Sequence, residues 1–503
     1  MIISGKYLRL PVSRGASKSK MLFLENGKLI FDLRVLLDNK KPDGYYYYDV
    51  TRFAGRDISF IVNGAEYDPE IVDFCLEGTG DEPLRPRMHF TAKRGWINDP
   101  NGLVYSSGVY HMFYQHNPVG YLWDNMHWSH AISRDLVNWK RLGCALYPDE
   151  MGTMYSGSGI VDERNVTGLA VGDAKTICLF YTAFGNAADG GNAELSKNKN
   201  SCQCLAYSVD GGKTFTKYER NPLISGYSKE ARDPKVIWVE ELGAYVLALY
   251  LERHDFMLFS STDLLTWEEY QRISIPSDSE CPDFYPLTAD DGKRKWVFSG
   301  ASDYYLIGDL TQSGFISTQG EKRMCRGNGR YASQTYSGTI RRIKTGWGTT
   351  PAPGQIFNNQ MSCFTEVTLR KINDEYFLCE YPVEEYGKSE KILLNCAFSG
   401  VKRICGFGLD ISINGITKAQ VMVGETEIDI DVDQRHLSVC GELFVLPVGA
   451  GDMRILVDTL GFELFADGGL VYLSYRGTGN RVTEIFTDTN VELMVGSVSA
   501  KIE

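Results

Sequence analysis

The stretch His89-Phe-Thr-Ala-Lys-Arg-Gly-Trp-Ile-Asn-Asp-Pro-Asn-Gly102 contains, in its second half, an aromatic ring, two amides and a carboxylate within seven residues. The proline after Asp99 biases that residue away from the α region, and the Asn-Gly pair that follows is a strong turn signal. These seven residues alone favour a hairpin corner. The alternative is a carboxylate fixed at the mouth of a pocket, with Trp96 as an apolar face and Asn98 as a hydrogen-bonding amide.

The composition is that of a globular β protein with several domains. A chain of 503 residues predicts two to four domains. Its 29 tyrosines, 24 phenylalanines and 51 glycines, without a collagen-like period, suit many short strands joined by tight turns. A net charge of -12 argues against nucleic acid and fits a neutral or cationic ligand.

The start of the chain and the cysteines indicate a location. Residues 1–11 contain no basic segment followed by a long apolar run, and no stretch of about 18 apolar residues occurs anywhere. We therefore expect no signal peptide and no membrane span. The 12 cysteines form no dense framework, which indicates reduced thiols in a cytoplasm.

Histidines and cysteines raise the alternative of a metal site. Five of the seven histidines fall within residues 89–130, namely His89, His111, His116, His127 and His130. No His-Glu-x-x-His pattern is present, so hydrogen-bonded structural roles are favoured. Cys202-Gln-Cys204 is the only close cysteine pair and lacks a second pair at zinc-site spacing. We expect neither a metal nor a cofactor.

Residues 1–80 alternate short apolar runs with turns and predict a small accessory β-sandwich. Glu25-Asn-Gly27 is a hairpin signal between two of the runs. Four consecutive tyrosines at residues 45–48 could form a sugar platform, but the two-residue period of a strand puts two on each face, which favours a half-buried strand. Residues 78–83 are predicted to be a linker.

Residues 84–385 repeat a unit of strands and turns. Ser133-Arg-Asp-Leu-Val-Asn-Trp139, Ser208-Val-Asp-Gly-Gly-Lys-Thr-Phe215 and Ser261-Thr-Asp-Leu-Leu-Thr-Trp267 share a Ser-x-Asp turn that leads to an aromatic residue. Each follows strand-like segments, as in an antiparallel meander. The spacing allows four to six units, and we predict a five-bladed β-propeller. Residues 388–503, in which Ile428, Ile430 and Val432 share one face of a strand, predict a second β-sandwich.

Three carboxylates could meet at one end of such a propeller, because its inner strands surround a common axis. They are Asp99, Asp233 in Arg232-Asp-Pro234, and Glu280 in Ser279-Glu-Cys-Pro-Asp283. Taken alone, Asp233 reads as a surface turn and Glu280 as part of a polar run.

Five segments together carry a resemblance. Residues 96–102, Phe113-Tyr-Gln-His-Asn-Pro118, Tyr155-Ser-Gly-Ser158, Arg232-Asp-Pro234 and Glu280-Cys281 resemble, in the right order, the signature segments of glycoside hydrolase family 32, the invertases, inulinases and levanases. The resemblance covers residues 84–385 and implies a five-bladed propeller with an appended β-sandwich. The first 80 residues look like an accessory domain of some bacterial fructan-degrading members.

The resemblance also implies an activity and residue roles. The activity is retaining hydrolysis of the terminal non-reducing β-D-fructofuranosyl residue of sucrose or short fructo-oligosaccharides, with an exo-acting fructanase as the alternative. Asp99 becomes the nucleophile, Glu280 the general acid/base and Asp233 the transition-state stabiliser. The implied substrate-binding residues are Trp96, Asn98, Gln115, Trp123, Tyr155, Ser156, Arg232, Tyr331 and Trp347.

This sequence departs from the family pattern at two positions near the site. Ser279 stands where an aromatic residue is common, and Tyr155 where phenylalanine is common, which puts the choice of substrate in doubt. Two other readings stay open, namely an inverting arabinan or xylan hydrolase and a non-catalytic sugar-binding propeller. The sandwich edges would also offer a surface for a homodimer.

Overall fold

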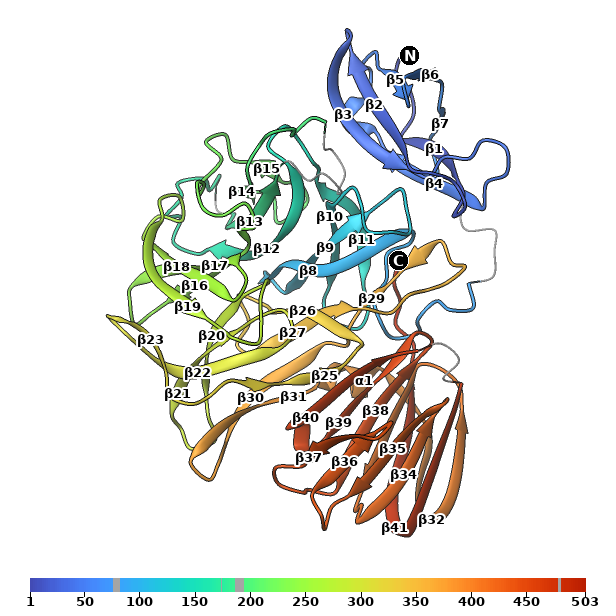
Figure 1. Cartoon of the computed structure of the whole chain (residues 1–503), viewed down its shortest axis with the longest axis vertical. Coiled ribbons are helices and arrows are strands. Elements are labelled where there is room, and N and C mark those ends of the chain that lie inside the picture. Colours follow the sequence, from blue (N-terminus) through green and yellow to red (C-terminus); the bar gives the residue numbers. More distant parts are fainter. Residues whose placement is uncertain (76–81, 173, 186–193, 478–480) are drawn as a thin grey trace.

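The computed structural model describes residues 1–75, 82–172, 174–185, 194–477 and 481–503 (Figure 1). The predicted fold class is confirmed, because the described residues form a small N-terminal β-sandwich, a β-propeller and a C-terminal β-sandwich. The linker predicted at residues 78–83 lies outside the described residues, except for its last two positions. No helix in the described part of the chain has the length and apolar character needed to span a membrane.

The N-terminal sandwich packs a sheet of three strands on a sheet of four. The first contains β4 (Gly44–Asp49), β1 (Tyr7–Val12) and β7 (Glu70–Val72); the second contains β3 (Lys28–Val35), β2 (Ser19–Glu25), β5 (Ser59–Val62) and β6 (Ala65–Tyr67); η1 (Thr51–Phe53) follows β4. The predicted hairpin joins β2 to β3, with Asn26 and Gly27 at φ of 50° and 76° as a two-residue turn of this kind requires. Tyr46 and Tyr48 lie in the core, as expected for a half-buried strand.

Five antiparallel sheets follow one another within the described part of residues 95–382. Blade 1 contains β8 (Gly95–Ser106), β9 (Val109–Asn117), β10 (His127–Ser133), β11 (Lys140–Leu146) and the parallel β28 (Phe357–Asn358); blade 2 contains β12 (Thr153–Asp162), β13 (Thr176–Phe184), β14 (Cys202–Ser208) and β15 (Thr216–Lys217); blade 3 contains β16 (Arg232–Val239), β17 (Ala244–Glu252), β18 (Asp255–Ser261) and β19 (Glu268–Ser274). Blade 4 contains β20 (Asp283–Thr288), β21 (Arg294–Ser299), β22 (Tyr304–Thr311), β23 (Gly314–Ser317) and β24 (Lys322–Arg323); blade 5 contains β26 (Arg330–Thr335), β27 (Ile343–Gly348), β29 (Gln360–Met361), β30 (Thr365–Ile372) and β31 (Glu375–Pro382).

Polar side chains join the first strands of neighbouring blades into a ring. Asn101 Oδ1 on β8 accepts a hydrogen bond from the backbone N–H of Gly157 on β12 at 3.2 Å. Ser158 Oγ accepts one from Val236 N on β16 at 2.9 Å. The carboxylate of Asp283 on β20 accepts one from the backbone N–H of Thr335 on β26 at 2.7 Å. Lys235 Nζ on β16 pairs with Asp283 Oδ1 at 3.1 Å and so links β16 to β20. The first strands β8, β12, β16, β20 and β26 thus lie around one axis, as in a propeller (Figure 1).

The repeated Ser-x-Asp segments connect the third and fourth strands of blades 1 to 3. In blade 1, Ser133 Oγ accepts a hydrogen bond from Leu136 N at 2.8 Å, and Asp135 Oδ1 accepts one from Asn138 N at 2.7 Å. Ser261 and Asp263 repeat this pattern in blade 3. The repeat is therefore a self-capped turn that sets the path into each outer strand.

The C-terminal sandwich is built from one continuous set of strands. Its strands are β25 (Cys325–Gly327), β32 (Glu390–Cys405), β33 (Leu409–Asn414), β34 (Lys418–Val423), β35 (Thr426–Asp431), β36 (His436–Val439), β37 (Glu442–Val445), β38 (Asp452–Asp458), β39 (Gly461–Ala466), β40 (Val471–Arg476) and β41 (Val482–Val498), with η2 (Asp467–Gly469) before β40 and α1 (Glu384–Ser389) before β32. One half of β41 pairs with β33 and the other half with β34, so this strand passes from one layer to the other. Ile428 and Ile430 are buried in the core between the layers.

A buried ionic cluster ties the propeller to the C-terminal sandwich. His89 Nδ1 lies 2.9 Å from Asp458 Oδ2, and His89 Nε2 lies 2.9 Å from Glu463 Oε2. Burial lowers the pKa of His89, but the hydrogen bonds to these two carboxylates and their charges raise it to about 10. His89 is therefore a charged link between two domains.

Candidate active site

One cavity of about 400 Å³ contains all twelve site residues that the sequence predicts. Its described lining consists of Trp96, Asn98, Asp99, Gln115, Trp123, Tyr155, Ser156, Arg232, Asp233, Glu280, Cys281, Tyr331 and Trp347. These residues come from β8, β9, β12, β16, β26 and β27 and from the segments before β10 and β20. Residues far apart in the sequence therefore meet where the inner strands of the propeller converge.

Asp99 is presented by an irregular strand and not by a hairpin corner. β8 runs through the whole segment, and its pairing with β9 shifts between Ile97 and Pro100 and again between Asn101 and Val104. The expectation of a hairpin corner is wrong, because the turn-forming residues lie within these two β-bulges and the strand continues through them. The hairpin turn falls later, at residues 107–108 between β8 and β9.

Short hydrogen bonds fix the carboxylate of Asp99. Ser156 Oγ donates to its Oδ2 at 2.5 Å, and Asn98 Nδ2 donates to its Oδ1 at 3.1 Å. Trp96 Nε1 donates in turn to Asn98 Oδ1 at 3.0 Å, which orients the amide. Burial raises the pKa of Asp99, while the bonds from Ser156 and Asn98 oppose that shift.

The thiol of Cys281 contacts the carboxylates of both Asp99 and Asp233. Cys281 Sγ lies 3.7 Å from Asp99 Oδ2 and 3.4 Å from Asp233 Oδ2. The backbone N–H of Cys281 also donates to Asp233 Oδ2 at 3.1 Å. Burial, reinforced by the negative charges of Asp99 and Glu280 and opposed by Arg232, raises the pKa of Asp233 to about 7.

Both oxygens of Glu280 are held. Arg232 Nη2 donates to Oε1 at 2.5 Å, and the Tyr331 hydroxyl donates to Oε2 at 2.6 Å. Arg232 Nε lies 3.8 Å from Asp233 Oδ2, so one guanidinium contacts two of the carboxylates that line the cavity, and it also pairs with Glu230 at 3.0 Å. The Arg232 side chain is 14% exposed and that of Glu280 is 30% exposed, which leaves Glu280 open to the cavity.

The backbone is strained where two of the carboxylates lie. Asp233, Glu280 and Cys281 have φ of 66°, 54° and 37°, in the left-handed region that side chains other than glycine rarely adopt. Each such residue costs on the order of 1–3 kcal/mol. Positive φ also occurs at turns elsewhere, for example at Leu136 and Leu264, so at the cavity it accompanies the carboxylates and does not by itself identify the site.

Aromatic rings form the walls of the cavity. Trp96 meets Trp347 edge to face at 5.7 Å, and Trp123 meets Tyr155 at 6.0 Å between ring centroids. Tyr155 stacks on Phe184, with centroids 4.2 Å apart. Rings beside amide and hydroxyl groups suit a ligand that has both apolar faces and many hydroxyls.

Sequence reasoning assigned no role to Cys281, Thr182 or Phe184. Cys281 was visible as the neighbour of Glu280, but only the structure shows that its thiol touches two carboxylates. Thr182 Oγ1 accepts a hydrogen bond from Asp233 N at 2.9 Å, and Phe184 supports Tyr155. Both lie on the largely apolar strand β13, where no motif marks them.

The four histidines on β9 and β10 of blade 1 have partners within the protein. His111 Nδ1 lies 3.1 Å from His130 Nε2, and His116 Nδ1 lies 2.7 Å from Ser129 Oγ. Tyr48 OH lies 3.1 Å from His127 Nε2. Among the residues that the structure describes, no group of three or more His, Cys, Asp or Glu side chains is arranged to hold a metal ion.

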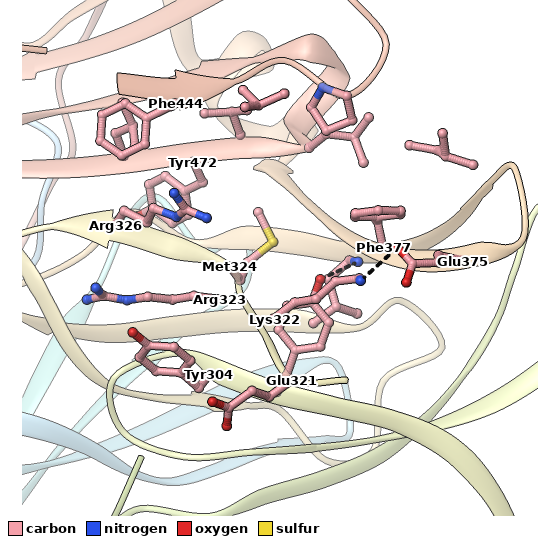
Figure 2. A pocket seen from close by; sticks show the side chains of 18 of the residues that line it. Tyr304, Glu321, Lys322, Arg323, Met324, Arg326, Glu375, Phe377, Phe444 and Tyr472 are labelled. Atoms are coloured by element: carbon pink, nitrogen blue, oxygen red, sulfur yellow. Dashed lines mark hydrogen bonds and ion pairs between the residues drawn. The ribbon is translucent and has the colours of Figure 1, made fainter. Parts of the chain in front are cut away.

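A larger groove, of about 1090 Å³, lies between the propeller and the C-terminal sandwich (Figure 2). Tyr304 and Phe377 face it from the propeller and Phe444 faces it from the sandwich, and Lys322 pairs with Glu375 at 3.1 Å on its wall. None of the twelve predicted site residues is among the described residues that line this groove. Chemistry, and not size, therefore identifies the candidate active site.

Carboxylates gathered beside aromatic rings in one cavity are the features of a glycoside hydrolase site. The family comparison agrees with this class. The model of the glycosyl hydrolases family 32 N-terminal domain matches residues 89–382, and the chain belongs to this family.

Known relatives are about one third identical to this chain over the aligned residues. A levanase of Bacillus subtilis is 33% identical over 335 residues, which is 61% of this chain and 48% of the levanase. An invertase of Schizosaccharomyces pombe is 34% identical over 322 residues, which is 57% of this chain and 53% of the invertase. The chain thus spans about half the length of these curated relatives. The exo-inulinase structure from Aspergillus awamori has a TM-score of 0.73 at 21% identity, covering 83% of this chain and 99% of that one, and shows a shared fold.

Proposed function

We propose that the protein is a retaining β-fructofuranosidase, which releases the terminal non-reducing β-D-fructofuranosyl residue from sucrose or short fructo-oligosaccharides. The observation that carries the proposal is the convergence of Asp99, Asp233 and Glu280 in one cavity, where the thiol of Cys281 contacts the first two. Family membership and the names of the relatives, a levanase and an invertase, support a fructoside as substrate.

In the first step, an Asp99 oxygen forms a bond to the anomeric carbon, C2, as the bond from C2 to the glycosidic oxygen breaks. The transition state resembles an oxocarbenium ion, so an anionic nucleophile opposite the leaving group lowers its energy. Glu280 gives its proton to the departing oxygen. The hydrogen bonds from Ser156 and Asn98 hold the attacking carboxylate in one orientation before substrate arrives.

The proton for this step is carried by Glu280, while Asp99 and Asp233 act as carboxylates. Three carboxylates lie near a single guanidinium, that of Arg232, among the residues that line the cavity. With a pKa raised to about 7, Asp233 becomes ionised as the pH rises through 7, and the ionised form is the one that stabilises positive charge on the sugar ring. Glu280, whose side chain is more exposed than that of Asp233, is placed to pass a proton to the glycosidic oxygen.

In the second step, water attacks C2 of the fructosyl-enzyme and gives a proton to Glu280, and the bond to Asp99 breaks. Two displacements at C2 restore the original configuration. Asp233, held by the backbone N–H of Cys281, accepts hydrogen bonds from sugar hydroxyls, and these strengthen as positive charge develops on the ring.

The substitutions Asp99→Asn, Asp233→Asn and Glu280→Gln test the three roles. Each should lower the turnover of sucrose or kestose by roughly three or more orders of magnitude, as removal of a catalytic group commonly does. Near-normal activity in any one of them would refute the role assigned to that residue. Failure of the unaltered protein to release fructose from sucrose, inulin and levan would refute the substrate class.

An exo-acting fructanase is the second candidate. The levanase relative and the exo-inulinase structure favour it, because both are named for longer fructans. Initial rates on sucrose, kestose, inulin and levan, measured side by side, separate the two. Rates that rise with chain length would indicate a fructanase, whereas rates highest on sucrose would indicate an invertase.

Two rival functions, the cellular location and the oligomeric state need their own tests. An inverting arabinan or xylan hydrolase would be recognised by product stereochemistry, and a non-catalytic sugar-binding propeller by calorimetric binding of fructans without hydrolysis. All 12 cysteines are free, which supports a protein of a reducing cytoplasm. Fractionation of the producing cells would test that location, and sedimentation would test the homodimer.

A further inference from the structure

The N-terminal sandwich holds the segment that carries Trp123, a wall of the candidate active site. This segment, residues 118–126, links β9 to β10 in blade 1. The family match begins only at His89, so the residues that hold the segment from outside belong to a domain that the family model does not include. The role of that domain is therefore open to inference from its contacts.

An ionic contact lies directly after Trp123. Asp124, whose side chain is 4% exposed, pairs with Lys18 Nζ at 2.8 Å and with Arg34 Nε at 3.1 Å. Both cations belong to the N-terminal sandwich. A carboxylate buried to this degree needs its partners, since loss of them would leave an uncompensated charge.

A reciprocal pair of hydrogen bonds lies one residue further on. Asn125 Oδ1 accepts from Arg34 N, and Asn125 Nδ2 donates to Arg34 O, both at 2.8 Å. The side chain of Asn125 thus takes the place of a neighbouring strand at the edge of β3. Its own backbone has a φ of 45°, a conformation that asparagine tolerates better than most residues.

The other side of Trp123 is held by packing. Val119 is fully buried in the hydrophobic core of the N-terminal sandwich, and Tyr121 packs against that core. The guanidinium of Arg14 lies 4.7 Å from the centre of the Tyr121 ring. Both flanks of Trp123 are therefore attached to the N-terminal domain, while Trp123 itself faces the cavity.

We infer that the N-terminal sandwich is a positioning element of the active site, which fixes Trp123 through residues 118–126 and so sets the affinity for the sugar. The inference rests on the proposed function. Under the proposed function the Trp123 ring contacts the sugar as part of the cavity wall and takes no part in the bond-breaking step, so loss of its position weakens binding of the ground state and the transition state alike. The effect belongs in KM and not in kcat.

The test uses the full chain with the double substitution Lys18→Ala and Arg34→Ala, which removes both cations from Asp124. KM for sucrose and for kestose should rise by roughly tenfold, with kcat within about twofold of the unaltered protein, as expected for lost uniform binding. Arg34→Lys with Lys18 retained keeps the charge and should restore most of the affinity. Arg56→Ala is the matched control, because Arg56 pairs with Glu25 at 2.7 Å inside the same sandwich.

A cycle with Trp123→Ala separates positioning from general destabilisation. If the two cations act through Trp123, their removal should have little further effect on KM once Trp123 is replaced. A tenfold increase of KM that persists in the Trp123→Ala background would overturn the inference, as would an unchanged KM in the double variant.

Hydrogen–deuterium exchange gives a readout that needs no activity. Backbone amides within residues 118–126 should exchange faster in the Lys18→Ala/Arg34→Ala variant than in the unaltered protein and the Arg56→Ala variant. Equal exchange in all three would overturn the inference. If the unaltered protein hydrolyses no fructoside, the proposed function fails, and the exchange rates still decide whether the domain fixes the segment.

Discussion

Replacing Arg232 by glutamine should move the acidic limb of the pH–rate profile upward. Arg232 Nε lies 3.8 Å from Asp233 Oδ2, and the Arg232 side chain is 14% exposed. At an effective dielectric constant of about 20, unit charges at that separation interact by about 4 kcal/mol, which corresponds to roughly three pKa units as an upper bound. After the site relaxes and water enters, at least about one pKa unit of this shift should remain.

The sign of the change follows from the charges. Arg232 opposes the increase that burial and the neighbouring carboxylates impose on the pKa of Asp233, which stands at about 7. Removing the cation favours the protonated acid, so the pKa rises and less Asp233 is ionised at neutral pH. Activity then falls at pH 7 and recovers in part as the pH is raised.

The assay is kcat/KM for sucrose from pH 4 to 10, because this ratio reports the titration of the free enzyme. The acidic limb should lie near 7 in the unaltered protein and about one unit or more higher in Arg232→Gln. Arg232→Lys keeps the charge and should leave the acidic limb within about half a pH unit, even if an ammonium group cannot contact Asp233 and Glu280 at once and the rate falls. A limb that stays in place or moves downward in Arg232→Gln would refute the reasoning.

Three further predictions address the site and its support. Tyr331→Phe removes the hydroxyl that donates to Glu280 at 2.6 Å and should lower kcat by roughly 10- to 100-fold, the contribution of a charge-assisted hydrogen bond. The control Tyr227→Phe loses an exposed hydrogen bond of 2.6 Å to Glu269 and should leave kcat unchanged. Equal kcat values for Tyr331→Phe and the unaltered protein would refute the role of Tyr331. Burial raises the pKa of the Cys281 thiol, so iodoacetamide at pH 7.5 should leave sucrose hydrolysis intact, and labelling of Cys281 by mass spectrometry would contradict this. His89→Ala should lower the free energy of unfolding in urea by about 3–5 kcal/mol, because it leaves Asp458 and Glu463 buried without their cation. In the unaltered protein, that stabilisation should be complete below the ordinary histidine pKa of about 6.5 and lost as the pH rises through about 10, and a pH-independent difference between the two proteins would count against it.

The site could be predicted from sequence because five short motifs, taken together and in order, resemble those of family 32, whereas Asp233 and Glu280 taken alone resemble surface residues. Asp99, Asp233 and Glu280 are each followed by residues that shape the local backbone, and all three reach the same cavity. The self-capped Ser-x-Asp turns similarly revealed repeating units before the closure of the ring was known. Local chemistry that repeats or is contiguous can be read from one sequence.

The errors and omissions have a common physical cause. Pro100, Asn101 and Gly102 form a turn signal in isolation, but pairing with β9 overrides it and converts the signal into bulges. The contact between Arg34 and Asp124 joins residues 90 positions apart, and no local pattern connects them. Tertiary contacts of this kind determine whether a local sequence pattern forms the structure it favours, and a single sequence does not show them.

Methanolysis of sucrose, followed by proton NMR, tests the central claim most directly. In water containing methanol, methanol competes with water for the fructosyl-enzyme formed on Asp99. The account predicts release of glucose together with methyl β-D-fructofuranoside, and neither product from Asp99→Asn. Methyl α-D-fructofuranoside, or no release of glucose by the unaltered protein, would contradict it.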